Sequence, residues 1–266
     1  MTIACQRWRD RRDSYRPAGE PIRTALYDVA RIDSDRIARA FVEQHHYSGS
    51  FPAARARFGL YRRDELVGVA VLSQPPSQAA LEVSCPLPVD ASARAELGRF
   101  VLLDNVPANG ESWFLARCFD LAARDGFAGI VAHSDPWQRT NAHGEAVFAG
   151  HLGTIYQATN ATYRGLTKPS TQRLLPDGTV LSPRALSKLR LRDRGWRYVV
   201  ELLLRHGAPE PDGDWRAWCT RAIGAVSRTY RHRGNHRYLW ALDRRLRRHL
   251  PASLPYPKAH ALEAAA

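Results

Sequence analysis

The sequence of 266 residues contains only four cysteines, and no two of them are close together. Cys5, Cys85, Cys118 and Cys219 form no Cys-x-x-Cys pair. A disulfide framework or a structural zinc site is therefore not expected, and a reducing cytoplasm is the expected compartment. We predict no metal site, and a metal held among His46, His133, His143 and Asp135 is the less favoured alternative.

Long apolar runs are also missing. No segment approaches the roughly 18 consecutive apolar residues that a membrane span needs. The first residues, MTIACQRWRDRR, lack the apolar segment of a secretory signal. With 44% hydrophobic and 24% charged residues, the composition is that of a folded soluble protein. We therefore expect a cytoplasmic protein that does not contact a membrane.

Lysine is scarce, because only 3 of the 39 basic residues are lysines and the rest are arginines. The charge is unevenly distributed. Residues 1–163 contain 18 basic and 18 acidic side chains, whereas residues 164–266 contain 21 basic and 8 acidic ones, so the net charge of +13 belongs to the second segment. Arginine binds phosphate bidentately and stacks on rings, and aromatic residues are interleaved here, so this pattern predicts a nucleic-acid surface. A solvated basic face over core tryptophans is the alternative. The candidate DNA contacts are Arg190, Arg192, Arg194, Arg197, Arg244 and Arg245.

The order of predicted elements indicates an α+β protein with a single sheet. The apolar segments 56–61 and 66–72 predict a hairpin, 96–103 and 127–132 predict strands, and 112–124 predicts a buried helix. We expect an N-terminal arm over residues 1–20, a catalytic core over 21–166, a basic DNA-binding extension that packs on the core over 167–258, and a flexible tail over 259–266.

Four short segments could carry chemistry, and each has an ordinary structural alternative. The loop with Asn109 and Gly110 leads into a helix that we expect to begin at Ser112, where free amides suit a pyrophosphate or another anion. Ser134 and Asp135 follow a predicted buried strand, so Asp135 could be a general base and Ser134 a hydrogen-bond donor. A capped turn and an Asp–Pro strand end are the corresponding alternatives.

The other two segments are aromatic. His46 and Tyr47 lie in a Gly/Ser-rich loop and could move protons or stack on a base, although adjacent histidines are usually solvated. Tyr156, on a predicted short helix, could be an acid or an oxyanion donor, although a buried structural tyrosine is commoner.

Taken together, the ordered motifs resemble a known family. These are His-Tyr-Ser-Gly at 46–49, Leu-Val-Gly-Val-Ala at 66–70, Gly-Arg-Phe-Val-Leu at 98–102, Asn-Gly-Glu-Ser at 109–112, His-Ser-Asp-Pro at 133–136 and Gly-Thr-Ile-Tyr-Gln-Ala at 153–158. They are similar to the Mom-like phage DNA-modification proteins, a branch of the GNAT acetyltransferase superfamily. The resemblance covers residues 45–166, and the segments 237–240 and 254–258 also look like phage members.

The resemblance implies an acetyltransferase-like (GNAT) mixed central sheet flanked by helices, with two parallel strands that splay apart. It implies acetyl-CoA or a related acyl-CoA as donor, and iron as a further cofactor. The carried-over positions are His46, Tyr47, Arg99, Ser112, Asp135 and Tyr156. In Mom the product is adenine that carries a carbamoylmethyl group on its exocyclic amine, which protects phage DNA from restriction. The implied partner is double-stranded DNA.

Two departures keep alternatives open. The acetyltransferase pyrophosphate motif Gln/Arg-x-x-Gly-x-Gly/Ala is absent, and the link over residues 137–151 is longer than usual. The alternatives are an acetyltransferase for a small amine, an aminoacyl-tRNA or a protein, and a nucleic-acid-binding protein without catalysis. A base in a duplex cannot react at its amine unless it is turned out of the stack, so the favoured reading needs both a pocket and a strong grip on phosphate.

Overall fold

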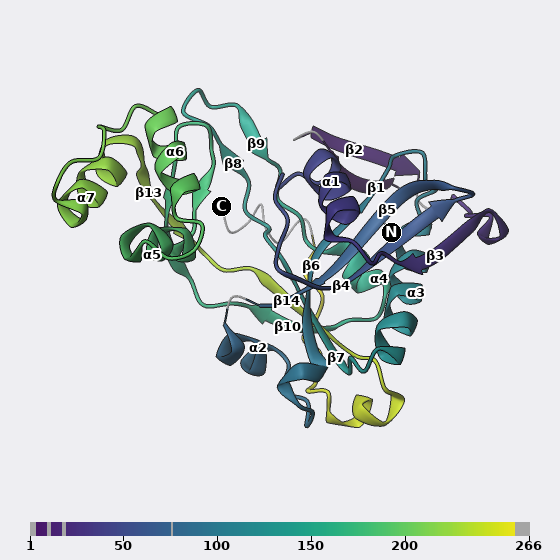
Figure 1. Cartoon of the computed structure of the whole chain (residues 1–266). Helices are drawn as coiled ribbons and strands as arrows, with labels where there is room; N and C mark the ends of the chain where they lie inside the picture. The colour runs from purple at the N-terminus through teal and green to yellow at the C-terminus, as the bar shows by residue number, and fades with distance from the viewer. Residues whose placement is uncertain (1–3, 10–11, 18–19, 76, 259–266) are drawn as a thin grey trace. The chain divides into compact units, whose positions relative to one another are not determined.

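The computed structural model describes residues 4–9, 12–17, 20–75 and 77–258. The chain divides into two compact units (Figure 1). Unit 1 comprises residues 1–136, 151–166 and 235–266, and unit 2 comprises residues 137–150 and 167–234. Relative to the segments expected from the sequence, residues 137–150 join unit 2 and residues 235–258 join unit 1. The expected tail over 259–266 lies outside the described residues.

Unit 1 is built on a seven-stranded mixed sheet with the order β10-β14-β7-β6-β5-β4-β3. Only β6 and β7 are parallel neighbours, and the other pairs are antiparallel. The α+β class and the mixed central sheet flanked by helices are thereby confirmed. The strands are β3 (Tyr27–Arg31), β4 (Ala54–Arg62), β5 (Glu65–Ser73), β6 (Arg94–Leu102), β7 (Gly129–Ser134), β10 (Thr162–Leu166) and β14 (His236–Ala241).

Helices cover both faces of this sheet, because apolar residues alternate sides along its strands. On β5, Val69 and Val71 pack against α1 (Asp35–His45), while Ala70 and Leu72 belong to the core on the opposite face. That second face carries α3 (Gly110–Arg124) and α4 (Thr154–Ala158). A short helix, α2 (Gln78–Ser84), packs on the first face near Val131 and Leu239.

The two parallel strands separate part-way along their length. Strands β6 and β7 are paired at only three positions, the last of which is Glu96 opposite Val131. Beyond it, β6 continues to Leu102 alongside β5, and β7 continues to Ser134 alongside β14. Their carboxyl ends therefore diverge, which is the splay that the resemblance implies. Open sheets bind ligands beyond such strand ends.

Strand β14 returns to the sheet from unit 2. It lies between β10 and β7, and its first residue, His236, is opposite Leu166, the last residue of β10. Residues 167–235 thus connect two neighbouring antiparallel strands. The segment 236–242 is predicted as a strand from its sequence, but its place inside the central sheet comes only with the structure.

Unit 2 combines a small sheet with three helices. The strands β11 (Ser170–Leu174), β12 (Val180–Leu181) and β13 (Arg228–His232) pair in the order β12-β11-β13, and β8 (Arg139–Thr140) pairs with β9 (Ala146–Phe148). The helices α5 (Pro183–Leu191), α6 (Arg197–Arg205) and α7 (Trp215–Val226) enclose a separate core around the fully buried Trp218. This unit has its own hydrophobic core, as an independent folding unit needs.

The remaining elements are short. The expected N-terminal arm contains a hairpin of β1 (Ala4–Arg9) and β2 (Arg12–Pro17). Single 3-10 turns cover Thr24–Leu26, Ala91–Ala93 and Arg244–His249, the last named η3. In the described ranges, no helix has the length and apolar character for crossing a bilayer. Cys85, Cys118 and Cys219 are buried free thiols.

Candidate active site at the parting of two strands

A carboxylate and an imidazole bridge the two parallel strands where they separate. His133 Nδ1 on β7 lies 3.1 Å from Glu96 Oε1 on β6, and both side chains are mostly buried. The bridge sits beside the last paired position of the two strands. A hydrogen-bonded carboxylate–imidazole pair at this place can hold or accept a proton.

The loop after α1 brings His46 to this opening in a defined tautomer. The backbone N–H of Ser48 donates to His46 Nδ1 at 3.1 Å, and Ser48 Oγ lies 2.9 Å from the same nitrogen. Because a backbone amide can only donate, Nδ1 is the acceptor and the ring proton is on Nε2. Burial, reinforced by the charges of Arg99 and His151, lowers the pKa of His46 to about 3. At neutral pH the ring is therefore uncharged.

Tyr47 connects this loop to a second histidine. Its ring centroid is 4.2 Å from that of His46 and 6.1 Å from that of His151, which it meets edge-on. The structure thus brings the predicted His46 and Tyr47 together as an aromatic pair. Such a pair offers ring surface for stacking.

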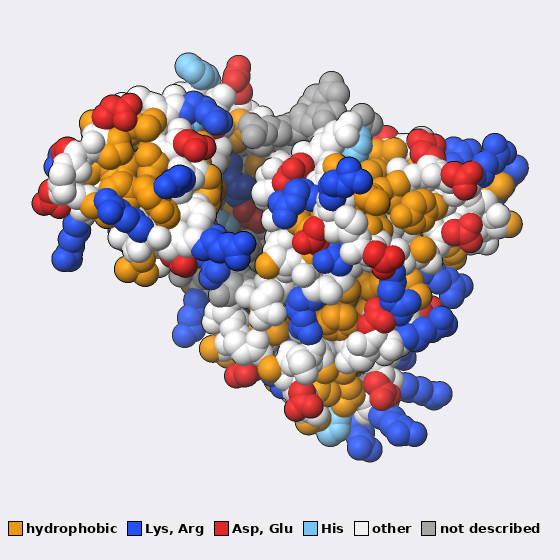
Figure 2. Space-filling view, viewed as in Figure 1, with side chains coloured by type: hydrophobic (Ala, Val, Ile, Leu, Met, Phe, Trp, Pro, Cys, Tyr) orange, Lys and Arg blue, Asp and Glu red, His pale blue; other side chains and the backbone are white. Residues whose placement is uncertain are grey.

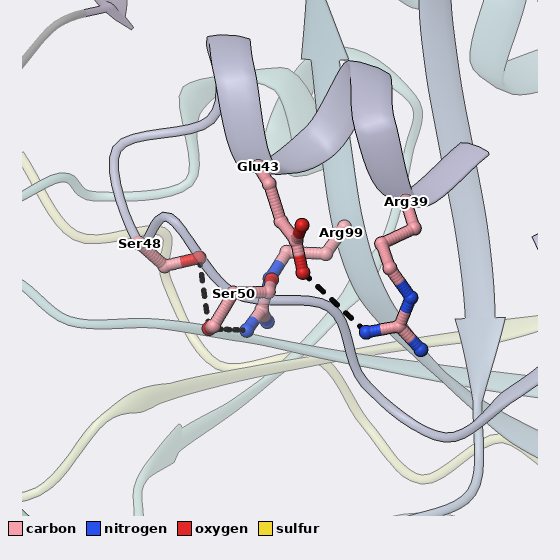
Figure 3. A network of polar contacts seen from close by, with 5 residues as sticks. All are labelled: Arg39, Glu43, Ser48, Ser50 and Arg99. Carbon is pink, nitrogen blue, oxygen red and sulfur yellow. Dashed lines mark hydrogen bonds and ion pairs between the residues drawn. The ribbon is translucent and has the colours of Figure 1, made fainter. Parts of the chain in front are cut away.

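Arg99 on β6 is tied to the same loop (Figure 3). Its Nε donates to the Ser50 carbonyl and its Nη2 to the Ser50 hydroxyl, both at 2.8 Å, and Ser50 Oγ reaches Ser48 Oγ at 3.4 Å. An ion pair of 3.4 Å between Arg39 and Glu43 on α1 flanks this network. Burial lowers the pKa of Arg99, although the guanidinium stays charged. Arg99 thus links β6 to the His46 loop and gives the opening a positive charge.

Tyr156 is buried on the α3/α4 face of the sheet. Burial is the main cause that raises its pKa, and the Tyr47 and Tyr238 hydroxyls add to it. Its ring is 5.3 Å from Tyr238 and 5.5 Å from Trp240. The phenol is therefore protonated at neutral pH and can donate a proton or a hydrogen bond.

Glycine is required just before this helix. Gly153 precedes α4 with φ +71°, a conformation that side chains rarely adopt. A Cβ there would lie 2.6 Å from the Tyr156 ring and 2.9 Å from the Tyr238 ring. The motif at 153–158 therefore positions Tyr156 through close packing that only glycine permits.

Ser134 and Asp135 end β7 beside two further histidines. Ser134 is buried next to Tyr238, whose hydroxyl donates to the Leu152 carbonyl. Asp135 accepts the His151 amide through its backbone carbonyl at 2.7 Å, and its charge acts on both His151 and His236. Burial nevertheless lowers the pKa of each of these histidines to about 4. Asp135 therefore lies beside two imidazoles that are neutral at neutral pH.

The α3 start differs from its expected form. The helix begins at Gly110, two residues before Ser112, because the turn that donates Gly110 N–H to the Pro107 carbonyl already winds the chain. Asn109 does not cap the helix; its Oδ1 accepts from Ile22 N–H at 2.8 Å. Helices without a side-chain cap keep first-turn amides for a ligand.

A carboxylate of the chain already binds at this loop. Glu20 Oε2 accepts the Ala108 amide at 3.2 Å, and its oxygen stands where a phosphate oxygen could. The loop therefore accommodates one carboxylate of the chain itself, but residues 103–113 contain no Lys or Arg, and Glu111 adds negative charge in the first turn. The fit to an acyl-CoA pyrophosphate is partial. The helix dipole would stabilise a bound phosphate, whereas the carboxylates of Glu20 and Glu111 would repel it.

Iron does not fit this group of residues. Among the described residues, no three His, Cys, Asp or Glu side chains converge as metal ligands would. We therefore assign no step to a metal.

The predicted DNA contacts fall on both units. Arg190, Arg192, Arg194 and Arg197 lie at the end of α5 and the start of α6 in unit 2, and all four are exposed. Arg244 and Arg245 are exposed on η3, which belongs to unit 1. Figure 2 shows hydrophobic side chains grouped on the viewed face of unit 2, with both basic and acidic side chains around them.

Comparison with known families settles the relationship that the motifs suggest. The model of the Mom protein family matches residues 26–258, which include every candidate site residue named above except Glu20 and Ile22. The chain belongs to the Mom protein family. The matched range spans the whole of unit 2.

Several solved acetyltransferase structures are similar to this chain, at low sequence identity. An acetyltransferase from Bacillus subtilis in complex with CoA is 12% identical, with 84% of this chain and 95% of that chain covered and a TM-score of 0.32. A tandem GNAT protein from the clavulanic acid biosynthesis pathway is 11% identical, with coverages of 74% and 65% and a TM-score of 0.36. An N-acetyltransferase from Staphylococcus aureus is 12% identical, with coverages of 71% and 68% and a TM-score of 0.31. No curated protein matches the chain.

Three residues of the opening are absent from the sequence-based prediction. Glu96 lies within a predicted strand, and nothing local distinguishes it from a solvent-facing residue. His151 and His236 come from segments 85 residues apart that meet only through the return of β14. The sequence signal that could have pointed to His236 is its position as a polar residue at the start of an otherwise apolar strand.

Proposed function

We propose that this protein is a DNA base-modifying transferase of the Mom type. It adds a small acyl-derived, carbamoylmethyl-like group to the exocyclic amine of adenine in double-stranded DNA. The observation that carries the proposal is the match to the Mom family over residues 26–258, together with an opening between β6 and β7 that gathers the motif residues. Family membership supports a Mom-type or acetyltransferase-like role, and the choice of adenine and of the group transferred is our proposal.

Asp135 is the proposed acceptor of the amine proton. The amine nitrogen forms a bond to a carbon of the transferred group, and its proton goes to the carboxylate. The position of Asp135 supports this role, because it directly follows β7 and its charge acts on His151 and His236. A carboxylate at a strand end, within reach of the opening, suits general base catalysis.

Tyr156 is the proposed donor to the leaving group. The bond between the transferred carbon and its leaving group breaks, and the departing atom takes the phenol proton. The raised pKa of Tyr156 supports a proton-carrying phenol, and the charge of Arg99, which favours the phenolate, makes the proton easier to release. Tyr156 thus supplies the proton that the leaving group takes.

The His46–Tyr47 pair is the proposed contact to the turned-out base. Ring stacking tolerates any base and compensates for stacking that is lost in the duplex. His46 Nε2–H can also donate a hydrogen bond, because its tautomer is fixed by Ser48. Arg99 and Ser50 hold this loop against β6, which fixes the place of the aromatic pair.

The α3 start with Asn109, Gly110 and Ser112 is the proposed site for the donor's phosphates. An acyl-CoA bound there would transfer its carbonyl carbon to the amine and release the CoA thiol, whereas a carbamoylmethyl group needs a donor that is activated at its methylene carbon. The uncapped helix and the carboxylate bound at Ala108 support anion binding at this loop. The basic turn of unit 2 and the arginines of η3 would grip DNA. The proposed setting is a phage or prophage protein in the host bacterial cytoplasm that protects DNA from restriction.

The test is mass spectrometry of nucleosides from plasmid DNA grown with the wild-type protein, with Asp135→Asn or with no protein. We expect a heavier deoxyadenosine with the wild type only, and its mass identifies the group. Asp28→Asn is the matched control, because Asp28 is an exposed aspartate on the outermost strand β3, and it should keep full modification.

The outcomes separate the alternatives. An active Asp135→Asn variant would remove the proposed base. Unmodified DNA in the presence of soluble wild-type protein would contradict the DNA-modification proposal itself. Consumption of acyl-CoA without DNA would then indicate an acetyltransferase for another amine.

A further inference from the structure

The turn between α5 and α6 carries an exposed cluster of arginines. Arg190, Arg192, Arg194 and Arg197 are all exposed, and none of the four makes an ion pair with a described residue. The one acid in the turn, Asp193, uses its Oδ1 to accept the Arg194 backbone N–H at 2.7 Å. Four unneutralised guanidiniums within eight residues repel one another, and a polyanion relieves that repulsion.

The backbone of this turn holds an arginine where glycine is preferred. Arg192 follows α5 with φ +52°, in the left-handed region. The Asp193 amide donates to the Lys188 carbonyl at 3.0 Å, which is the hydrogen bond of a Schellman cap. Glycine suits this position best, so an arginine here carries backbone strain. Strained residues of this kind concentrate where a side chain has a function.

Tryptophans pre-orient that side chain. The Arg192 guanidinium lies 4.3 Å from the Trp215 ring centroid and 5.7 Å from that of Trp196. Stacking fixes the plane of the guanidinium and leaves its edge free to bind oxygen. The turn therefore presents at least one cation whose side-chain entropy is already reduced before binding.

A large aliphatic side chain projects from the middle of this charge. Leu191 is 75% exposed, the highest value among the large hydrophobic residues of the described chain. It lies directly between Arg190 and Arg192. Proteins that open DNA insert apolar side chains of this size between base steps while arginines hold the flanking phosphates. Leu191, an exposed aliphatic side chain between two arginines that can bind phosphate, has the composition of such a wedge.

We propose that the α5–α6 turn grips duplex DNA and inserts Leu191 into the base stack. Arg190 and Arg194 bind backbone phosphates, Arg192 supplies the pre-oriented contact, and Leu191 fills the gap at an opened base pair. The inference rests on the proposed function, since a modified adenine amine must leave the duplex. Double-stranded DNA is the partner, because it is the substrate of the proposed function and a DNA duplex can be kinked by an inserted apolar side chain.

The experiment compares a perfect DNA duplex with the same duplex that contains one mismatched pair, by fluorescence anisotropy of the full-length protein. Insertion of a wedge costs less free energy at a weakened step, so the wild type should prefer the mismatched duplex by about 10-fold, near the stacking free energy of one base-pair step. Leu191→Ser should reduce that preference to less than about 2-fold and keep the salt dependence. Val83→Ser is the matched control, because Val83 is 66% exposed on α2 of unit 1, and it should keep the preference.

Two further variants separate phosphate binding by the arginines from insertion of Leu191. Arg190→Ala with Arg194→Ala should lower the slope of log affinity against log salt by about 1.8, as the loss of two phosphate contacts requires. Arg192→Gly should weaken binding severalfold without lowering the melting temperature of unit 2, because glycine relieves the backbone strain. An unchanged mismatch preference in Leu191→Ser overturns the wedge, and tighter wild-type binding to the equivalent RNA duplex overturns the choice of partner.

The nucleoside assay is run in parallel, so that failure of the Leu191 wedge can be distinguished from failure of the proposed function. Modified DNA with an unchanged Leu191→Ser mismatch preference removes the wedge alone. Unmodified DNA with a lost preference removes the catalytic proposal and leaves the DNA grip.

Discussion

Mild acid should destabilise unit 1 through its buried histidines, and His236 gives the sharpest test. His236 is 4% exposed on β14, its Nδ1 lies 2.6 Å from the Tyr163 hydroxyl, and burial lowers its pKa from 6.5 to about 4. The folded protein therefore keeps the ring neutral at a pH where the unfolded chain binds a proton. Stability is unaffected above pH 6.5 and falls as the pH drops from 6.5 towards 4.

The size of the effect follows from the two pKa values. At pH 5 an unfolded histidine is almost fully protonated, whereas a group with a pKa of about 4 is mostly neutral. The difference in proton binding is worth about 2 kcal/mol for this residue between pH 7 and pH 5. Since whole domains are stable by only about 5–15 kcal/mol, the loss is readily measured.

The assay is urea unfolding at pH 7 and pH 5, followed by hydrogen exchange of the β14 amides, so that the readout belongs to the central sheet. His236→Gln keeps an amide that can bond to Tyr163 but removes the titration. The variant should lose about 2 kcal/mol less than the wild type between the two pH values. Equal losses in the two proteins would refute a neutral buried His236.

Two other perturbations follow from the site. Gly153→Ala should cost at least about 1 kcal/mol from its left-handed backbone alone and should also displace Tyr156, so both the melting temperature and DNA modification should fall; an active, equally stable variant contradicts the packing argument. Glu20→Gln should strengthen acetyl-CoA binding in calorimetry, because it removes the carboxylate at the α3 start, whereas the exposed Glu65→Gln should not change it. Equal affinities in wild type and Glu20→Gln would place the phosphates elsewhere.

Local patterns predicted the elements whose residues alternate or run apolar over a short window. The hairpin of β4 and β5, strand β7 and helix α3 follow from such runs, and their observed ends differ from the predicted ones by a few residues. Helix α7 was not predicted, because Trp215, Trp218 and Cys219 are compatible with a basic aromatic surface until the core they fill is known.

The candidate site also combines residues that the sequence predicts with contacts that only the structure reveals. His46, Tyr47, Asp135 and Tyr156 stand in short motifs that the sequence displays, and unit 1 contains all four. Contacts such as that of Glu96 with His133 depend on which strands are neighbours, and the pairing of β6 with β7 cannot be read from either segment alone. The neutral state of His236 depends on burial by residues far away along the chain.

The pairing of Leu166 with His236 makes the greater part of unit 2 an enlarged hairpin loop. Its two ends leave and re-enter the sheet on adjacent strands, so a short turn could join β10 to β14 without changing their register. During synthesis, β7 has no β14 neighbour until residues 167–234 have been made, so the inserted unit can fold before the sheet that carries it is closed. An arrangement of this kind lets the inserted unit acquire changes in its surface while the strands that hold Asp135 and Tyr156 stay the same.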